Sequence, residues 1–123
     1  MKKDIEIPIV EDVYVAAVRE ENKTFRSQDW NAYLINDKKH PIEMVLIIAR
    51  GFEGKDLTST MRHSIKLLPA KSFAKIEFMQ DEVLRLNNEF LVTFFEDNRM
   101  YEKKFIFRKN TVKENAAVKI PII

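Results

Sequence analysis

The sequence predicts an all-β protein, an antiparallel immunoglobulin-like β-sandwich of about seven strands with a short C-terminal helix. Apolar and polar residues alternate with a period of two through several segments, which is typical of strands. Turn residues separate these segments at intervals of roughly 8–12 residues. The longest apolar run, 41–52, begins at Pro41, and the only two glycines, Gly51 and Gly54, mark its end. Its β-branched residues favour a strand over a buried helix.

Length and composition narrow the class of protein. We expect one β-sandwich domain over residues 1–123, because a chain of 123 residues suffices for one domain. The net charge of +2 is too balanced to indicate nucleic-acid binding by itself. The chain has no cysteine, which excludes disulfides, cysteine nucleophiles and thiolate metal sites. Acidic residues interrupt the N-terminal segment and no apolar run is long enough to span a membrane, so we expect a cytoplasmic location.

The first half of the chain contains an edge strand and three further strands. Residues 4–9 alternate, but Pro8 restricts them to an edge strand or an extended arm. Residues 12–20 and 28–37 are predicted strands, separated by a polar loop that exposes Phe25. Turn residues then lead into the central strand, 41–52. Since both faces of this strand are apolar in the middle, we expect it to be covered on both sides.

Two more strands follow. Residues 58–68 alternate, with Met61, His63, Ile65 and Leu67 predicted to point inward. Residues 72–79 alternate in the same way, with Phe78 predicted to point inward and Glu77 outward.

The last part of the chain predicts a helical turn, a hairpin and a helix. Residues 81–88 suit a single helical turn that Asp81 caps and that Asn87 or Asn88 closes. Residues 89–96 and 99–108 are strands joined by a tight turn at Asp97 and Asn98. The capping box that starts at Thr111 predicts a short helix near 112–118.

The sequence predicts no catalytic site. His63 and Ser64 are neighbours on a strand and point to opposite faces, so they do not form a triad with Asp56. We expect His63 to be a packed, hydrogen-bonded core histidine. The two histidines and the acidic residues lack the spacing of a metal site, and no glycine-rich phosphate loop is present. We therefore expect no enzymatic activity, no metal, no cofactor and no small-molecule substrate.

Two surfaces are candidates for binding. The strand 89–96 is apolar on both faces, like 41–52, and its second cover is either the C-terminal segment 112–123 or another molecule. This favours a protein-binding or homodimeric module with contacts at Arg50 and Phe52. The alternative is RNA binding through a basic stripe beside Phe73, an aromatic residue able to stack on a base. Glu77 on the same face argues against the stripe. The complete candidate surface is Arg50, Phe52, Arg62, Lys66, Lys71, Phe73 and Lys75.

Six segments carry a resemblance to a known family: VEDVYVA (10–16), DWNAYLIN (29–36), IEMVL (42–46), MRHSIK (61–66), LPAKSFAKIE (68–77) and LNNEFLVTFF (86–95). They resemble a small cytoplasmic family of flavobacteria and related Bacteroidetes that often carries the label "phenylalanyl-tRNA synthetase subunit alpha". The chain is too short for a class II synthetase catalytic domain, and Arg50 to Glu53 lacks the spacing of its arginine motif. The resemblance therefore implies no catalytic residue. It supports an accessory role in RNA binding or with a tRNA synthetase.

Overall fold

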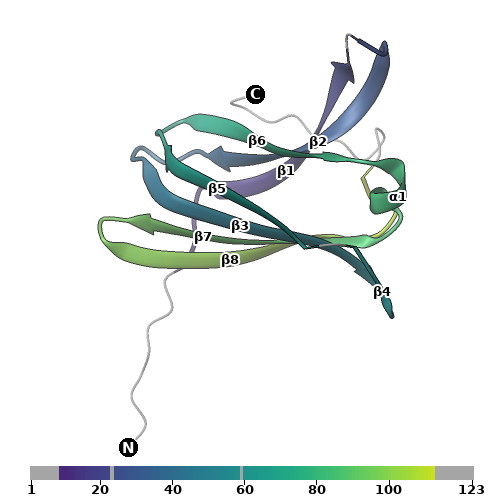
Figure 1. Ribbon diagram of the computed structural model, residues 1–123. Helices are drawn as coiled ribbons and strands as arrows, with labels where there is room; N and C mark the ends of the chain where they lie inside the picture. The colour runs from purple at the N-terminus through teal and green to yellow at the C-terminus, as the bar shows by residue number, and fades with distance from the viewer. Residues whose placement is uncertain (1–8, 23, 59, 113–123) are drawn as a thin grey trace, which may run out of the picture.

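The computed structural model describes residues 9–22, 24–58 and 60–112. Within them the chain forms antiparallel strands and one short helix (Figure 1). The elements are β1 (Val13–Asn22), β2 (Ser27–Asn36), β3 (Ile42–Glu53), β4 (Asp56–Leu57), β5 (Met61–Leu68), β6 (Ser72–Met79), α1 (Asp81–Leu84), β7 (Asn87–Glu96) and β8 (Arg99–Phe107). The predicted antiparallel β architecture is confirmed, and only the two-residue β4 was not expected.

The strands form two sheets that lie one above the other in Figure 1. The three-stranded sheet has the order β1-β2-β6. In the five-stranded sheet, β3 and β7 are central, β8 lies beside β7, and both β5 and β4 pair with the free side of β3. The chain therefore changes sheets between β2 and β3, between β5 and β6, and between β6 and β7.

The core lies between the two sheets. Phe90 and Phe94 on β7 and Ile47 on β3 are fully buried, and they face Leu34 on β2 and Val13 on β1. Two aromatic contacts extend this packing to β8, from Phe90 to Phe107 and from Phe94 to Tyr101, with ring centroids 5.8 and 5.2 Å apart. The inner face of the five-stranded sheet is thus a dense aromatic layer, in keeping with its Phe-rich sequence.

The predicted turns are confirmed in part. Asp97 and Asn98 have φ values of 52° and 61°, and positive φ at both central residues is the requirement of a tight hairpin turn. The helical turn is also present as α1, but its N-cap is Gln80, whose side chain makes no capping bond, so the prediction for Asp81 is wrong. The Asn88 side chain does close this turn, because it donates to the carbonyls of Val83 and Leu86. The predicted edge strand 4–9 and helix 112–118 lie outside the described residues, apart from Ile9 and Val112.

Two inward-facing predictions are wrong because the strands are irregular. In β6, the pairing with β2 shifts by one residue at Ile76, so Phe78 turns outward and is 50% exposed while Met79 is 2% exposed. In β5, Leu67 is 47% exposed and Leu68 is buried. The alternation there slips opposite Met44, whose φ of 48° marks a matching irregularity in β3. A single extra residue reverses every side chain beyond it.

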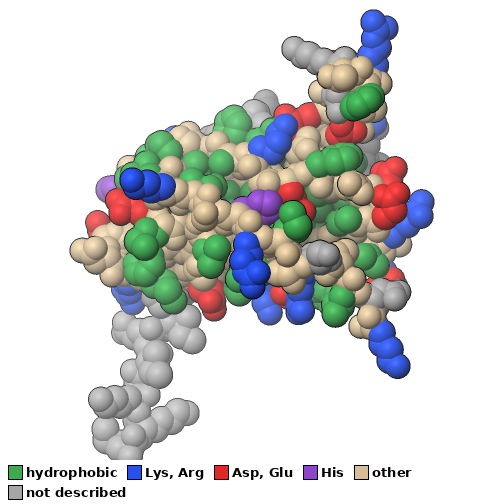
Figure 2. All heavy atoms as spheres, in the orientation of Figure 1, with side chains coloured by type: hydrophobic (Ala, Val, Ile, Leu, Met, Phe, Trp, Pro, Cys, Tyr) green, Lys and Arg blue, Asp and Glu red, His purple; other side chains and the backbone are tan. Residues whose placement is uncertain are grey.

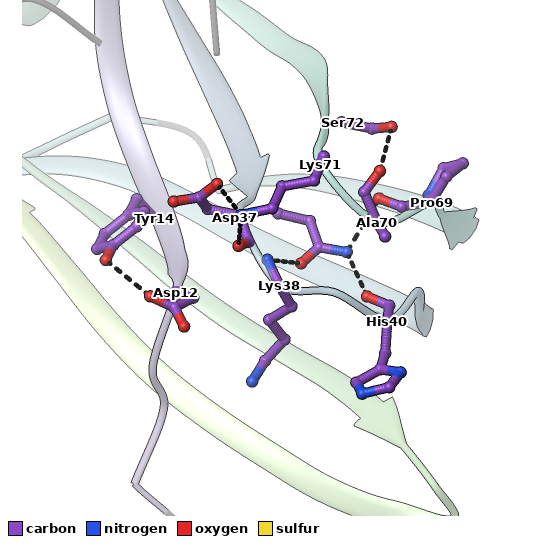
Figure 3. Close-up of polar contacts among 10 residues, drawn as sticks. Asp12, Tyr14, Asp37, Lys38, His40, Pro69, Ala70, Lys71 and Ser72 are labelled. Atoms are coloured by element: carbon purple, nitrogen blue, oxygen red, sulfur yellow. Dashed lines mark hydrogen bonds and ion pairs between the residues drawn. The ribbon is translucent and has the colours of Figure 1, made fainter. Parts of the chain in front are cut away.

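A buried asparagine, Asn36, joins the turns at one end of the sandwich, and Figure 3 labels its partners Lys38, His40 and Pro69. The Asn36 amide nitrogen donates to the carbonyls of His40, Leu68 and Pro69 at 3.0, 3.2 and 3.0 Å. Its side-chain oxygen accepts the backbone N–H of Lys38 at 3.0 Å. One side chain therefore fixes the β2–β3 turn against the β5–β6 turn.

Candidate functional site

The outer face of the five-stranded sheet carries both apolar and charged side chains, and several of them are exposed to solvent. The strand register places its residues in rows across the strands, because directly paired residues share a face. One row is Arg62, Ile48, Leu91 and Lys104, and the next is Ser64, Leu46, Thr93 and Glu102. The flanking rows contain Arg50, Glu89 and Ile106 on one side and Leu67, Glu43, Phe95 and Met100 on the other. We call this set of residues, together with Met44, the open face.

Several large apolar side chains on the open face are exposed to solvent. Met44, Leu46, Leu67, Met100 and Ile106 have 68, 37, 47, 53 and 45% of their surface exposed. They adjoin the half-buried Ile48, Leu91 and Phe95, so the exposed apolar surface is continuous across the strands. Singly scattered apolar residues need no explanation, but a continuous patch marks a contact surface.

The second face of β3 was predicted to be covered, and among the described residues it is not. The inner side chains Val45, Ile47 and Ala49 are at most 3% exposed, whereas Met44 and Leu46 on the outer side face solvent. On the outer side of the three-stranded sheet, Tyr33 and Ile35 of β2 are 6 and 3% exposed, while Tyr14, Phe73 and Phe78 are 45, 44 and 50% exposed. Among the described residues, both outer faces therefore carry exposed large apolar side chains.

A charged cluster lies at one end of the open face. Glu89 on β7 accepts from Arg50 Nε at 3.2 Å and lies 3.4 Å from Lys104 Nζ. The Arg50 guanidinium also lies over the ring of Phe52, 5.6 Å from its centroid. One carboxylate thus faces two cations, and this end of the sheet retains a positive charge.

The seven residues of the predicted interaction surface do not form one surface. Arg50, Phe52, Arg62 and Lys66 belong to β3 and β5 of the five-stranded sheet. Lys71, Phe73 and Lys75 precede or belong to β6 of the three-stranded sheet. The expected basic stripe is divided between the two sheets, because β5 and β6 follow each other in sequence but pair with different strands. On the side of the molecule in Figure 2, the basic side chains are separated by hydrophobic and other side chains.

The lysines of β6 and its preceding turn have acidic partners. Lys71 Nζ donates to the side chain and to the carbonyl of Asp37, at 2.9 and 2.8 Å (Figure 3). Lys75 Nζ lies 3.5 Å from Glu20 Oε1 and 5.9 Å from the centroid of the Tyr33 ring. These ion pairs reduce the positive potential that a phosphate backbone requires.

Tyr33 is the centre of a network that the sequence did not indicate. Its hydroxyl donates to Glu20 Oε1 at 2.7 Å, and Asn31 donates to the same oxygen at 2.9 Å. Phe73 packs edge-on against the Tyr33 ring with centroids 5.7 Å apart. Phe73 remains 44% exposed beside this contact, and its stacking on a base stays a prediction.

The phenol of Tyr33 is expected to ionise at unusually high pH. Burial, the hydrogen bond to Glu20 and the charge of that carboxylate together raise the pKa of Tyr33 from 10.0 to about 12. A group whose pKa is raised by folding contributes stability that is complete below the unfolded pKa. This contribution is therefore present below pH 10 and is lost between pH 10 and about pH 12.

Ultraviolet absorbance of tyrosinate, measured during alkaline titration, tests this expectation. The chain has three tyrosines, and subtraction of the Tyr33→Phe curve isolates Tyr33. Glu20→Gln should lower the pKa of Tyr33 because it removes the carboxylate charge. Ionisation of all three tyrosines together near their ordinary pKa would contradict the network.

His63 forms a bridge between the two sheets and not a catalytic pair with Ser64. His63 Nε2 lies 3.1 Å from Glu77 Oε1 across the adjoining edges of β5 and β6, and both side chains are 22% exposed. The predicted hydrogen bond is present, but the predicted burial in the core is wrong, and Glu77 points to His63 because of the bulge at Ile76. Ser64 lies on the open face beside Leu46, as the alternation of the strand requires.

A further hollow of about 350 Å³ lies between the start of β2 and α1. Its lining consists of Ser27, Gln28, Asp29, Trp30, Phe78, Met79, Gln80, Asp81 and Glu82. The three carboxylates there do not form a metal-binding group, and no such group of His, Cys, Asp or Glu exists among the described residues. Within 9–22, 24–58 and 60–112, no helix has the length and apolar content needed to cross a membrane.

Comparison with models of protein families, with curated proteins and with solved structures finds no match for this chain. The resemblance to the flavobacterial family therefore stays a prediction.

Proposed function

We propose that this protein is a non-catalytic interaction module that binds another protein chain through the open face. The observation that carries the proposal is the continuous exposed apolar surface over β3, β7 and β8, with Leu46, Met100 and Ile106 at 37, 53 and 45% exposure. Burial of apolar area stabilises a complex by about 25 cal/mol per Å². Covering the apolar side chains of this face with a partner is therefore favourable. The proposal keeps the cytoplasmic location that the sequence predicts.

The proposal includes an immunoglobulin-like arrangement of the strands. The order β1-β2-β6 follows the A-B-E order of an immunoglobulin sheet, and β3-β7-β8 follows C-F-G. The difference is β5, which pairs with β3 and so enlarges the sheet that carries the open face. The additional strand β5 widens the surface of this sheet that is available for docking.

RNA binding is the weaker alternative. It rested on Arg62, Lys66, Lys71 and Lys75 acting together, and the two sheets separate the first pair from the second. Lys71 and Lys75 also form ion pairs with Asp37 and Glu20. Since phosphate binding depends on several cations acting on one backbone, this arrangement does not favour it.

Site-specific photocross-linking in the expressing cell tests the proposal. A photoreactive phenylalanine analogue at Met100, on the open face, should form covalent adducts with protein. The same analogue at Phe78 is the matched control, because Phe78 is 50% exposed against 53% for Met100 but lies on the other sheet. No adducts from Met100, or equal adducts from both positions, would overturn the proposal.

A further inference from the structure

Charges on the open face divide it into a basic half and an acidic half. Arg50, Arg62 and Lys104 lie in the two rows at one end, where Glu89 is the acidic residue. Glu43 and Glu102 lie in the two rows at the other end, with Lys66 at the β5 edge. The apolar side chains of the open face occupy the middle and both ends of this arrangement. A surface with opposite charges at its two ends can be complementary to itself.

Two identical sheet faces that meet by a two-fold rotation have their rotation axis in the plane of contact. If the axis runs across the strands, each strand opposes the same strand of the second copy with its direction reversed. The row containing Lys104 then opposes the row containing Glu102, so these two residues meet across the interface twice. By the same rotation Arg50 opposes Glu43 of the second copy.

The alternative axis runs along the strands and exchanges β5 with β8. It places Arg62 opposite Lys104 of the second copy twice, which is unfavourable, and Arg50 opposite Glu89 twice, which is favourable. The axis across the strands gives only opposite-charge pairs, Lys104 with Glu102 and Arg50 with Glu43, so the charge pattern favours it. This axis also brings apolar residues together, since Ile48 opposes Leu46 and Ile106 opposes Met100 of the second copy.

We propose that the partner of the open face is a second copy of this chain, bound by a two-fold axis across the strands with reciprocal Lys104–Glu102 ion pairs. This inference rests on the proposed function and names its partner. Sheets that pack face to face prefer nearly aligned strands, which this axis provides.

The size of the open face sets the expected affinity. Four strands about 4.8 Å apart and rows spanning six residue steps of about 3.4 Å give a projected area on the order of 400 Å² per copy. Stable interfaces bury about 800 Å² of accessible surface per partner, so the dimer is a weak one. We expect association in the micromolar range or weaker.

Charge reversal tests the pairing directly, with sedimentation equilibrium from about 1 μM to about 1 mM, which brackets that range. The full-length protein should show a monomer–dimer equilibrium. Lys104→Glu and Glu102→Lys should each weaken dimerisation at least about tenfold, because each places two like-charged pairs in the interface. The double variant should dimerise like the unmodified protein, and an equimolar mixture of the two single variants should form a heterodimer.

Lys103→Glu is the matched control, since Lys103 is exposed on the same strand but pairs with Val92 on the opposite face of the sheet. It should leave the equilibrium unchanged. The double variant also controls for the ion pair between Lys104 and Glu89 within one chain, because it loses this ion pair just as Lys104→Glu does. Thermal melting of each variant confirms that it is folded.

A monomer at every concentration would overturn the inference, and so would a dimer that the single variants do not weaken or that the double variant does not restore. Failure of the proposed function looks different. If the protein is monomeric but Met100 still forms adducts with other proteins, only the choice of partner is wrong. If Met100 forms no adducts at all, the interaction module itself is wrong.

Discussion

Replacing Asn36 with alanine will lower the free energy of unfolding by about 3 kcal/mol, because a buried carbonyl or N–H without a partner costs about 1–3 kcal/mol. Asn36 is completely buried and makes four hydrogen bonds to the backbone of two turns. Alanine removes all four and leaves the Leu68 carbonyl without this donor in the interior. Urea denaturation followed by circular dichroism measures the change.

Asn36→Asp separates hydrogen bonding from volume. Aspartate has nearly the same size and keeps the acceptor for Lys38 N–H, but it points a carboxylate at three carbonyl oxygens. At neutral pH it should therefore destabilise the protein more than alanine does, and acidification should recover part of the loss. Asn87→Ala is the control, because Asn87 makes one exposed bond to Lys109 N–H and should cost less than about 1 kcal/mol. Equal losses for alanine and aspartate would contradict the proposed role of the amide donors.

The strands were predictable because their side chains alternate and their ends carry turn residues. Residues 28–37, 41–52, 72–79 and 89–96 match β2, β3, β6 and β7 to within two residues. The tight turn at Asp97 and Asn98 was predictable for a related reason, since few residue pairs accept positive φ at both positions. Local sequence and local geometry agree at these places, so no distant contact is needed to specify them.

Side-chain direction was not predictable where a strand contains an extra residue. Phe78 looks inward by alternation, and only the pairing of β6 with β2 shows that Ile76 shifts the register. The division of the basic residues between two sheets has the same origin, because a change of sheet between β5 and β6 leaves no mark in the sequence. The Asn36 network depends on Pro69, 33 residues away, and the Tyr33 network on Phe73, 40 residues away. Alternation carries no information about such distant contacts.

The apolar part of the open face was predictable, because β3 and β7 carry apolar side chains on both of their faces. The sequence indicated an excess of apolar surface over what one sandwich interior needs. It did not indicate that Glu43 and Glu102 lie at one end and Arg50 and Lys104 at the other, since this depends on the register of two strand pairs, β3–β7 and β7–β8. The strand register therefore determines where the charged side chains lie among the apolar side chains of this face.

The two faces of the five-stranded sheet should respond in opposite ways to truncation. At a concentration where the protein is monomeric, Phe94→Ala will lower the free energy of unfolding by about 4 kcal/mol, because it leaves a cavity under a fully buried ring. Leu46→Ala will cost less than about 1 kcal/mol, since the Leu46 side chain is already 37% exposed. Both residues lie on central strands of one sheet, so the contrast isolates the face that each side chain occupies.

The same pair of variants connects stability to binding. At concentrations that favour the dimer, Leu46→Ala should weaken association, because Leu46 opposes Ile48 of the second copy in the proposed arrangement. Urea denaturation at low and high protein concentration measures both effects in one series. A large loss for Leu46→Ala in the monomer would mean that the open face is covered within the chain and serves the fold. A loss confined to high concentration would mean that the apolar residues of this face are there for a partner, since they contribute little to the stability of the single chain.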